Sequence, residues 1–128
     1  MINRQISNTF MRLAHQYPVV TLTGPRQSGK TTLCRTLFHT YDYVNLEDLS
    51  KRGFATEDPH WFLAQFPDGV ILDEIQRAPD LLSYIQGIVD ERQRSGHFIL
   101  TGSQQFEVTN AINQSLAGRT AILRLLPF

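Results

Sequence analysis

The most informative feature of this sequence is a set of four residues at a fixed spacing: Gly24, Gly29, Lys30 and Thr31. They complete the pattern G-x-x-x-x-G-K-[ST]. The two glycines permit a tight turn and let backbone N–H groups approach phosphate oxygens with no Cβ in the way. The lysine offers a mobile cation to β- and γ-phosphates, and the threonine hydroxyl is a hard oxygen ligand for Mg²⁺. The pattern favours a phosphate-binding loop over a helix-entry loop with incidental glycines.

The predicted loop continues into a helix that begins near Lys30. The positive end of a helix dipole at this point would add to the attraction for an anion. We therefore predict that the following consecutive residues bind nucleotide: Gly24, Pro25, Arg26, Gln27, Ser28, Gly29, Lys30, Thr31 and Thr32. Arg26 could instead be an ordinary arginine with no role in binding, because the variable positions of such loops tolerate many residue types.

Two acids, Asp73 and Glu74, end the apolar stretch "GVILDE" (residues 69–74). Acids in this place are often no more than first-turn residues favoured by a helix dipole. Beside a phosphate-binding loop they have a second interpretation. Asp73 would hold Mg²⁺, mostly through water, and Glu74 would polarise an attacking water.

Polar residues at two further places are candidates for the same site. "LTGSQQ" ends another strand-like stretch, and Thr101 or Ser103 could reach a γ-phosphate and the attacking water, with Ser103 preferred. A plain turn at Gly102 is the alternative. Arg119 follows Gly118 and could stabilise transition-state charge on its own nucleotide or on that of a neighbouring subunit, unless it is an ordinary surface arginine.

The elements that must position these residues alternate along the chain. The spacing of Ile2, Ile6, Phe10 and Leu13 predicts an N-terminal helix. The following strands are predicted: 19–24, 41–48, 69–74, 97–103 and 120–128. The following helices are predicted: 30–38, 60–66, one opened by Pro79 and ended by Gly96, and 107–118. Strands that alternate with helices predict βαβ units and a mostly parallel sheet.

Composition limits the class of protein. The chain has 128 residues, twelve basic and twelve acidic side chains, and one cysteine, Cys34. The balanced charge gives no support to nucleic-acid binding, although it does not exclude it. One cysteine permits no intramolecular disulfide, and neither a secretion signal nor a membrane span is visible. We expect a cytoplasmic protein.

Four segments together, "GPRQSGKTTL", "GVILDEIQRAPDLL", "FILTGSQQF" and "SLAGR", resemble the prokaryotic AAA-type ATPases of the archaeal-ATPase-like family. The resemblance implies a P-loop NTPase fold, which is a three-layer αβα sandwich with a mostly parallel five-stranded sheet. In this sheet the sensor strand, which ends in "LTGS", lies between the Walker A strand and the Walker B strand. It implies Gly29, Lys30 and Thr31 at the nucleotide and Mg²⁺. It also implies Asp73 at the metal, Glu74 at the water and Ser103 at the sensor position.

The same resemblance implies that residues 1–128 form an AAA-type core belonging to a longer architecture, since such proteins usually carry a further C-terminal domain. Arg119 matches the family's glycine-arginine element. We expect ATP and Mg²⁺ as ligands and ATP hydrolysis as the reaction. The alternatives are a nucleotide-operated module with little turnover that engages a protein or DNA partner, and a small-molecule kinase. A homo-oligomer is a further possibility, and a GTPase is disfavoured because no asparagine-lysine-x-aspartate stretch is present.

Overall fold

The computed structural model describes residues 4–25, 28–103 and 105–125. Its centre is a five-stranded sheet with the order β2-β3-β4-β1-β5, in which every strand pairs in parallel with its neighbours. The strands are β1 (Val19–Thr23), β2 (Asp42–Asn45), β3 (Val70–Asp73), β4 (Phe98–Gly102) and β5 (Thr120–Arg124). The predicted α/β fold with a parallel sheet is confirmed, and β4 separates β1 from β3.

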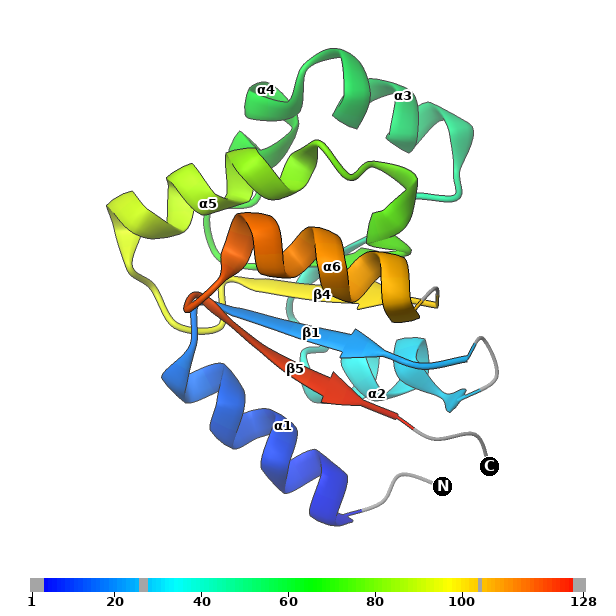
Figure 1. Ribbon diagram of the computed structural model, residues 1–128, viewed down its shortest axis with the longest axis vertical. Helices are drawn as coiled ribbons and strands as arrows, with labels where there is room; N and C mark the ends of the chain where they lie inside the picture. The colour runs from blue at the N-terminus through cyan, green and yellow to red at the C-terminus, as the bar shows by residue number, and fades with distance from the viewer. Residues whose placement is uncertain (1–3, 26–27, 104, 126–128) are drawn as a thin grey trace.

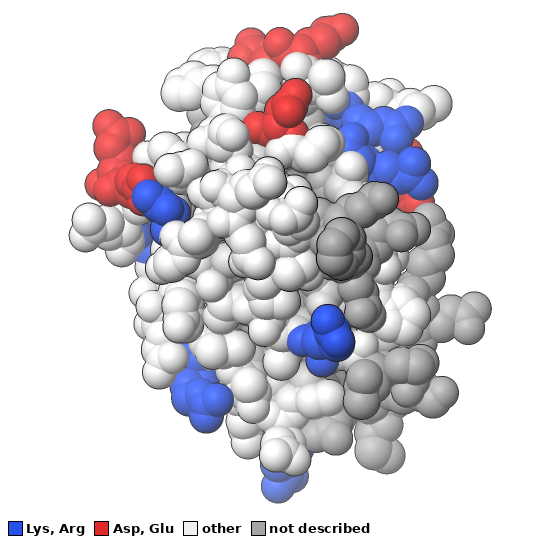
Figure 2. Space-filling view, in the orientation of Figure 1, with Lys and Arg blue, Asp and Glu red and all other residues white. Residues whose placement is uncertain are grey.

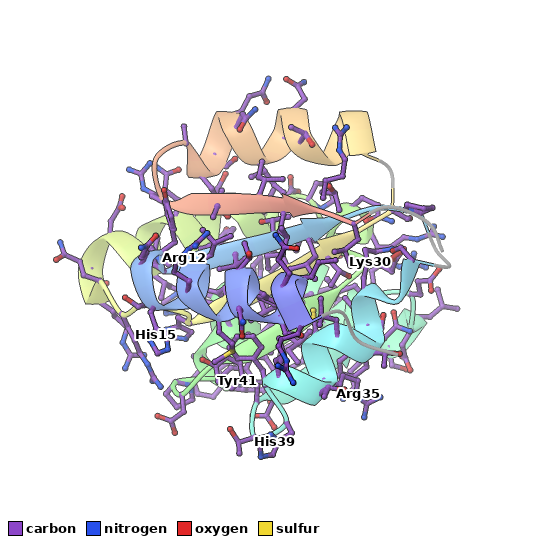
Figure 3. All side chains as sticks on the ribbon, turned by 90° about the horizontal axis from the view of Figure 1, so that it is seen from below. Arg12, His15, Lys30, Arg35, His39 and Tyr41 are labelled. Carbon is purple, nitrogen blue, oxygen red and sulfur yellow. The ribbon has the colours of Figure 1, made fainter. Side chains whose placement is uncertain are left out.

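Helices cover both faces of this sheet. On one face lie α1 (Arg4–Gln16) and α2 (Lys30–Leu37), and on the other lie α3 (Leu49–Glu57), α4 (Pro59–Ala64), α5 (Leu81–Arg92) and α6 (Gln105–Leu116). Figure 1 shows this arrangement from the side of α6. In Figure 3 the strands lie between α6 and the pair α1 and α2. Among the described helices, none is long and apolar enough to cross a membrane.

Each face of the sheet carries an apolar core, and successive side chains of each central strand alternate between the two cores. Ile71 and Ile99 pack toward α1 and α2, whereas Leu72 and Leu100 pack toward α3 to α6. All four side chains are at most 1% exposed. Because both faces of the sheet are covered, these strands are continuous apolar runs rather than alternating ones. This is the physical reason that the sequence predicts their positions well.

The strand register brings three strand ends to one edge of the sheet. Thr23 of β1 lies beside Gly102 of β4, and Leu72 of β3 lies beside Leu100 of β4. The loop after β1, the acids after β3 and the turn after β4 therefore meet at this carboxyl edge. In open parallel sheets this is the edge at which ligands bind.

One helix, α3, was not predicted. Its sequence "LSKRGFATE" contains Gly53 and no regular apolar stripe. Two other contributions stabilise the helix. Asp48 caps its first turn by accepting from Ser50 N at 2.9 Å and Lys51 N at 3.2 Å, and Ala55 is buried in the core.

The predicted end of the helix after Pro79 is wrong by several residues. α5 ends at Arg92, and Gln93 takes the left-handed cap position with φ 51°. Gly96 instead forms the next turn, with φ 68°, where its N–H donates to Tyr17 O at 2.8 Å.

The second strand is also shorter than predicted, because β2 spans Asp42–Asn45 and not residues 41–48. β5 ends at Arg124, and residues 126–128 of the predicted last strand lie outside the described residues.

Candidate functional site

The loop between β1 and α2 closes on itself through backbone contacts. Ser28 N donates to Pro25 O at 3.1 Å, and Gly29 precedes α2 with φ 84°, a left-handed conformation that favours glycine. Leu33 N then donates to Gly29 O at 2.9 Å, which begins the helical hydrogen bonding. Arg26 and Gln27, both predicted to bind nucleotide, lie outside the described residues. Thr32 lies in the first turn of α2.

Lys30 points back into the loop. Its ammonium donates to the carbonyl of Gly24 at 3.0 Å and to that of Pro25 at 2.9 Å, and the residue is only 3% exposed. A buried ammonium is costly unless it is hydrogen-bonded, so these carbonyls stabilise the cation inside the loop. Figure 3 labels Lys30 at the end of the sheet where α2 begins. A positive charge is therefore held at the carboxyl edge of the sheet.

Asp73 is the acceptor for three hydroxyl groups from three different elements. Thr31 of α2 donates to Oδ2 at 3.0 Å, Tyr43 of β2 donates to the same oxygen, and Thr101 of β4 donates to Oδ1. The residue is 5% exposed. These donors fix its orientation, and they bring the predicted metal ligands Thr31 and Asp73 into direct contact.

Tyr43 was not predicted as a site residue. Burial, and then the hydrogen bond to Asp73, raises the pKa of its phenol, so the group stays protonated and remains a donor. The guanidinium of Arg35 lies over its ring, 4.4 Å from the centroid. No sequence signal identifies this role, because a tyrosine in a strand is usually a packing residue.

Glu74 has an unusual backbone for a residue other than glycine. Its φ of 62° and ψ of 54° are left-handed, and the residue is 6% exposed. Such a conformation costs about 1–3 kcal/mol and persists where the surroundings enforce it. Here Glu74 N donates to Thr101 Oγ1 at 3.0 Å, and Glu74 Oε1 accepts from Ser103 Oγ at 3.0 Å and from Gln76 Nε2 at 3.0 Å.

The two polar candidates at the end of β4, Thr101 and Ser103, differ in their contacts. Thr101 is fully buried between Asp73 and the backbone of Glu74, so its hydroxyl is already used by these two acids. Ser103, which directly follows β4, is partly exposed and contacts the carboxylate of Glu74. Of the two, Ser103 is the side chain that lies beside the predicted water-activating group.

The residues of this edge fit a nucleotide with Mg²⁺. Ser28 Oγ is buried and has no hydrogen-bond partner among the residues that the structure describes. Thr31 and Asp73 present the hard oxygen donors that Mg²⁺ prefers. Within the described ranges, no group of three or more His, Cys, Asp or Glu side chains could hold a metal ion. Mg²⁺ commonly binds with one or two protein ligands and completes its shell with water and phosphate oxygens.

Arg119 lies away from these residues. It precedes β5, and Val19 at the start of β1 pairs with Thr120, so Arg119 is at the amino edge of the sheet. Its guanidinium binds the carboxylate of Asp90 in a bidentate manner, at 2.6 Å and 2.9 Å. This hydrogen bond lowers the pKa of Asp90 and raises that of Arg119. The geometry does not bring Arg119 to the phosphate loop of its own chain.

The fold and this edge together define a class of protein. A parallel sheet of order β2-β3-β4-β1-β5, with a phosphate loop after β1 and the two acids at the end of β3, is that of an AAA-type P-loop NTPase. The family model described as "AAA domain" matches residues 16–128. The chain belongs to this family.

Two mycobacterial proteins are similar to this chain in sequence. An uncharacterized protein of Mycobacterium tuberculosis, Rv2008c, is 34% identical over 127 residues, and the match covers 95% of this chain. The chain spans only 28% of that relative's length. The match to the corresponding uncharacterized protein of Mycobacterium bovis has the same identity and coverage.

Solved structures share the fold at low sequence identity. The Walker-type ATPase PABY2304 of Pyrococcus abyssi superposes with a TM-score of 0.70 and 17% identity, over 98% of this chain and 53% of that one. AMPPCP-bound DnaA from Aquifex aeolicus has a TM-score of 0.64 and 12% identity, over 98% and 48%. The P-loop NTPase domain of an Escherichia coli sigma-54 activator has a TM-score of 0.60 and 14% identity, over 100% and 99%.

Proposed function

We propose that this chain is an ATP-binding domain that requires Mg²⁺ and hydrolyses ATP. The observation that carries the proposal is the convergence of three groups at the carboxyl edge of the sheet. The Lys30 ammonium lies inside the loop, and the Thr31 hydroxyl lies 3.0 Å from the Asp73 carboxylate. A cation beside a pair of hard oxygen ligands is the arrangement needed to hold a phosphate chain together with its metal.

The proposed binding roles use these contacts. Lys30 would exchange its two carbonyl partners for phosphate oxygens, which form stronger, charge-assisted hydrogen bonds. Thr31 and Asp73 would hold Mg²⁺, and the buried hydroxyl of Ser28 would gain an acceptor. Bound Mg²⁺ would supply positive charge at the phosphates. The nine residues from Gly24 to Thr32 form the proposed loop for ATP.

The proposed catalytic group is Glu74. Its carboxylate follows the predicted metal ligand Asp73 and lies beside Ser103, at the same edge of the sheet. A carboxylate in this position can orient an attacking water and accept its proton. Ser103 would contact the γ-phosphate and the same water. General-base assistance of this kind contributes about 10²–10⁴-fold to a rate.

Arg119 has a proposed role only between subunits. It lies at the amino edge of the sheet in its own chain, so a contact with nucleotide requires a second copy. Its ion pair with Asp90 is partly exposed, with side-chain accessibilities of 32% and 48%. In a homo-oligomer Arg119 would leave Asp90 to contribute positive charge to the neighbouring site.

A second candidate function is a nucleotide-operated module that changes conformation with little turnover. Its support is that the fold neighbours of this chain include the DnaC helicase loader, with a TM-score of 0.58 and 14% identity. A protein partner is preferred to DNA. The sequence has twelve basic and twelve acidic side chains, and both signs are present on the face shown in Figure 2. We also propose a cytoplasmic location.

Calorimetric titration with Mg²⁺-ATP tests the binding. The wild-type chain is expected to bind, and Lys30→Ala to weaken binding at least about 100-fold, since each hydrogen bond to a charged group contributes about 1.5–3 kcal/mol. Lys51→Ala is the matched control, because Lys51 is the other lysine of the sequence and is exposed on α3. A folded wild-type chain that does not bind Mg²⁺-ATP would contradict the proposal. Competition with GTP measures base preference.

Phosphate release tests the hydrolysis. Glu74→Gln is expected to retain Mg²⁺-ATP binding and to lower turnover by about 10²-fold or more. Wild-type binding without turnover would favour the nucleotide-operated module instead. Transfer of phosphate to an added acceptor rather than to water would favour a kinase.

A further inference from the structure

Gln76 lies next to the proposed catalytic glutamate and was not among the residues predicted from the sequence. Its amide nitrogen Nε2 donates to Glu74 Oε1 at 3.0 Å and to Ser103 Oγ at 3.1 Å. Ser103 Oγ in turn donates to Glu74 Oε1 at 3.0 Å. The three side chains form a closed triangle of hydrogen bonds, which we call the Glu74 triangle.

The chemistry of the Glu74 triangle fixes the direction of each bond. An ionised carboxylate only accepts, so the Gln76 amide must turn its NH₂ group toward Glu74. Ser103 Oγ then accepts a hydrogen bond from Gln76 and donates one to the carboxylate. Both donors end on Oε1 of Glu74. The arrangement therefore distinguishes the two oxygens of this carboxylate, and Oε2 has no part in the triangle.

The other end of the Gln76 amide supplies a second observation. Its oxygen Oε1 is buried and has no hydrogen-bond partner among the residues that the structure describes. A buried acceptor without a donor is destabilising, and a water molecule that makes two or more hydrogen bonds is the usual remedy. The amide oxygen is attached to the same carbon as the nitrogen that contacts Glu74. It is thus an acceptor for a water close to the carboxylate.

The backbone around Gln76 is held on both sides. The residue belongs to a short 3-10 helix, Ile75–Arg77, which directly follows the left-handed Glu74. Ile75 anchors this turn in the core with 1% exposure, and Arg77 N donates to Glu74 O at 3.0 Å. The burial of Ile75 and the hydrogen bond of Arg77 N hold the backbone on both sides of Gln76, and this support presents the glutamine side chain to Glu74.

We propose that Gln76 is a positioning residue, which holds Oε1 of Glu74 against Ser103 and directs Oε2 toward the attacking water. The inference rests on the proposed ATP hydrolysis for its effect on turnover. The position of the carboxylate, however, is a property of the chain without nucleotide. A glutamine that only completed a polar turn would stabilise the fold without changing what Glu74 does.

The first measurement uses the nucleotide-free chain. In ¹⁵N-labelled protein, the side-chain NH₂ resonances of Gln76 are assigned from their loss in Gln76→Met, which keeps a similar volume. Their exchange with solvent is expected to be slowed relative to exposed glutamines such as Gln93. Ser103→Ala should accelerate that exchange and shift the resonances, because the triangle loses one corner. Exchange as fast as that of exposed glutamines in the wild-type chain would overturn the proposal.

The second measurement is the kinetics with Mg²⁺-ATP. Gln76→Ala and Gln76→Met are expected to lower kcat by about 10–100-fold, as loss of an orienting partner does at other sites, with KM changed by about twofold at most. Gln86→Ala is the matched control, since Gln86 is a half-buried glutamine on α5 outside the triangle. In a Glu74→Gln background, Gln76→Met should cause no further loss, because the two residues act as one unit.

The outcomes separate the two proposals. If Gln76→Met lowers kcat by the same factor in the wild-type and the Glu74→Gln backgrounds, the positioning role is refuted while hydrolysis stands. The same holds if Gln76→Met lowers kcat no more than Gln86→Ala does. A wild-type chain that binds Mg²⁺-ATP but does not hydrolyse it would refute the proposed reaction. In that case slowed exchange of the Gln76 amide would still establish the position of the Glu74 carboxylate.

Discussion

The substitution Gly24→Ala tests how the phosphate loop is joined to the last strand of the sheet. Gly24 has φ 154°, and a Cβ added there would lie 2.6 Å from the backbone oxygen of Leu125 and 3.1 Å from Ser28 Oγ. Leu125 N also donates to Thr23 O at 2.7 Å. The new methyl group would therefore meet a backbone that is already held in place.

The expected effect is a loss of about 3 kcal/mol from the free energy of unfolding. Backbone strain at such a φ contributes about 1–3 kcal/mol. Movement of the Leu125 carbonyl away from the methyl group contributes about 1–3 kcal/mol, as overpacking does elsewhere. Lower conformational entropy of the unfolded alanine variant offsets about 0.4–1 kcal/mol of this loss.

Urea unfolding followed by circular dichroism measures this change. With a slope of about 2 kcal/mol per M, the midpoint should fall by about 1.5 M. Gly87→Ala is the control, since Gly87 lies exposed within α5 and a Cβ there would have no atom within 4 Å. That control should stabilise the chain by up to about 1 kcal/mol, because alanine is the better helix former. The two substitutions thus have opposite expected signs.

The binding of Mg²⁺-ATP should weaken in Gly24→Ala even where the chain is fully folded, because the displaced loop also carries the carbonyl that contacts Lys30. A midpoint within about 0.3 M of the wild type would refute the reasoning, since it corresponds to about 0.6 kcal/mol. So would a variant that loses stability but binds Mg²⁺-ATP unchanged. An unchanged midpoint would mean that the loop can move away from Leu125 without a loss in the free energy of unfolding.

Three further predictions concern other groups. Tyr43→Phe removes a donor to Asp73 and should raise the Mg²⁺ concentration needed for half-maximal ATP binding by about tenfold, measured by Mg²⁺ titration; an unchanged or lower requirement would contradict it. Burial lowers the pKa of His97 below its ordinary value of 6.5, so below that pH the unfolded chain takes up a proton that the folded chain does not. The free energy of unfolding should therefore fall as the pH drops below 6.5, and His97→Gln should flatten that decline in urea titrations at several pH values; equal slopes would count against it. Burial, and then Asp73, raises the pKa of Cys34, so alkylation by iodoacetamide should occur only at the rate of unfolding; rapid labelling of the native chain would show that the thiol is accessible.

The parallel sheet could be predicted from the sequence because its central strands are buried on both faces and form short apolar runs. α3 could not, because its stability comes from Asp48 at its first turn and from the burial of Ala55, neither of which gives a periodic pattern. The end of α5 was misassigned for a related reason. Gln93 adopts the left-handed cap conformation, and Gly96 serves the contact with Tyr17.

The candidate site divides in the same way. Lys30 and Thr31 belong to a local pattern whose spacing is set by one turn and one helix, so the sequence alone suggests their chemistry. Their roles in binding nucleotide and metal remain predictions. Tyr43 and Gln76 could not be predicted, because their contacts with the two acids depend on the order of strands and on a single left-handed residue. Hydroxyl and amide side chains within apolar segments give no signal of such contacts.

The position of β5 has a consequence for how the chain acquires its function during synthesis. β1, which carries the loop, lies between β4 and β5, the last two strands to be made. The hydroxyls of Thr21 and Thr120, 3.1 Å apart, join residues separated by 99 positions. Contacts between such distant segments form slowly, because a long loop must close before they contribute. The nascent chain must therefore emerge almost to residue 125 before the loop after β1 has a complete support, which would make the proposed nucleotide binding a late event in folding.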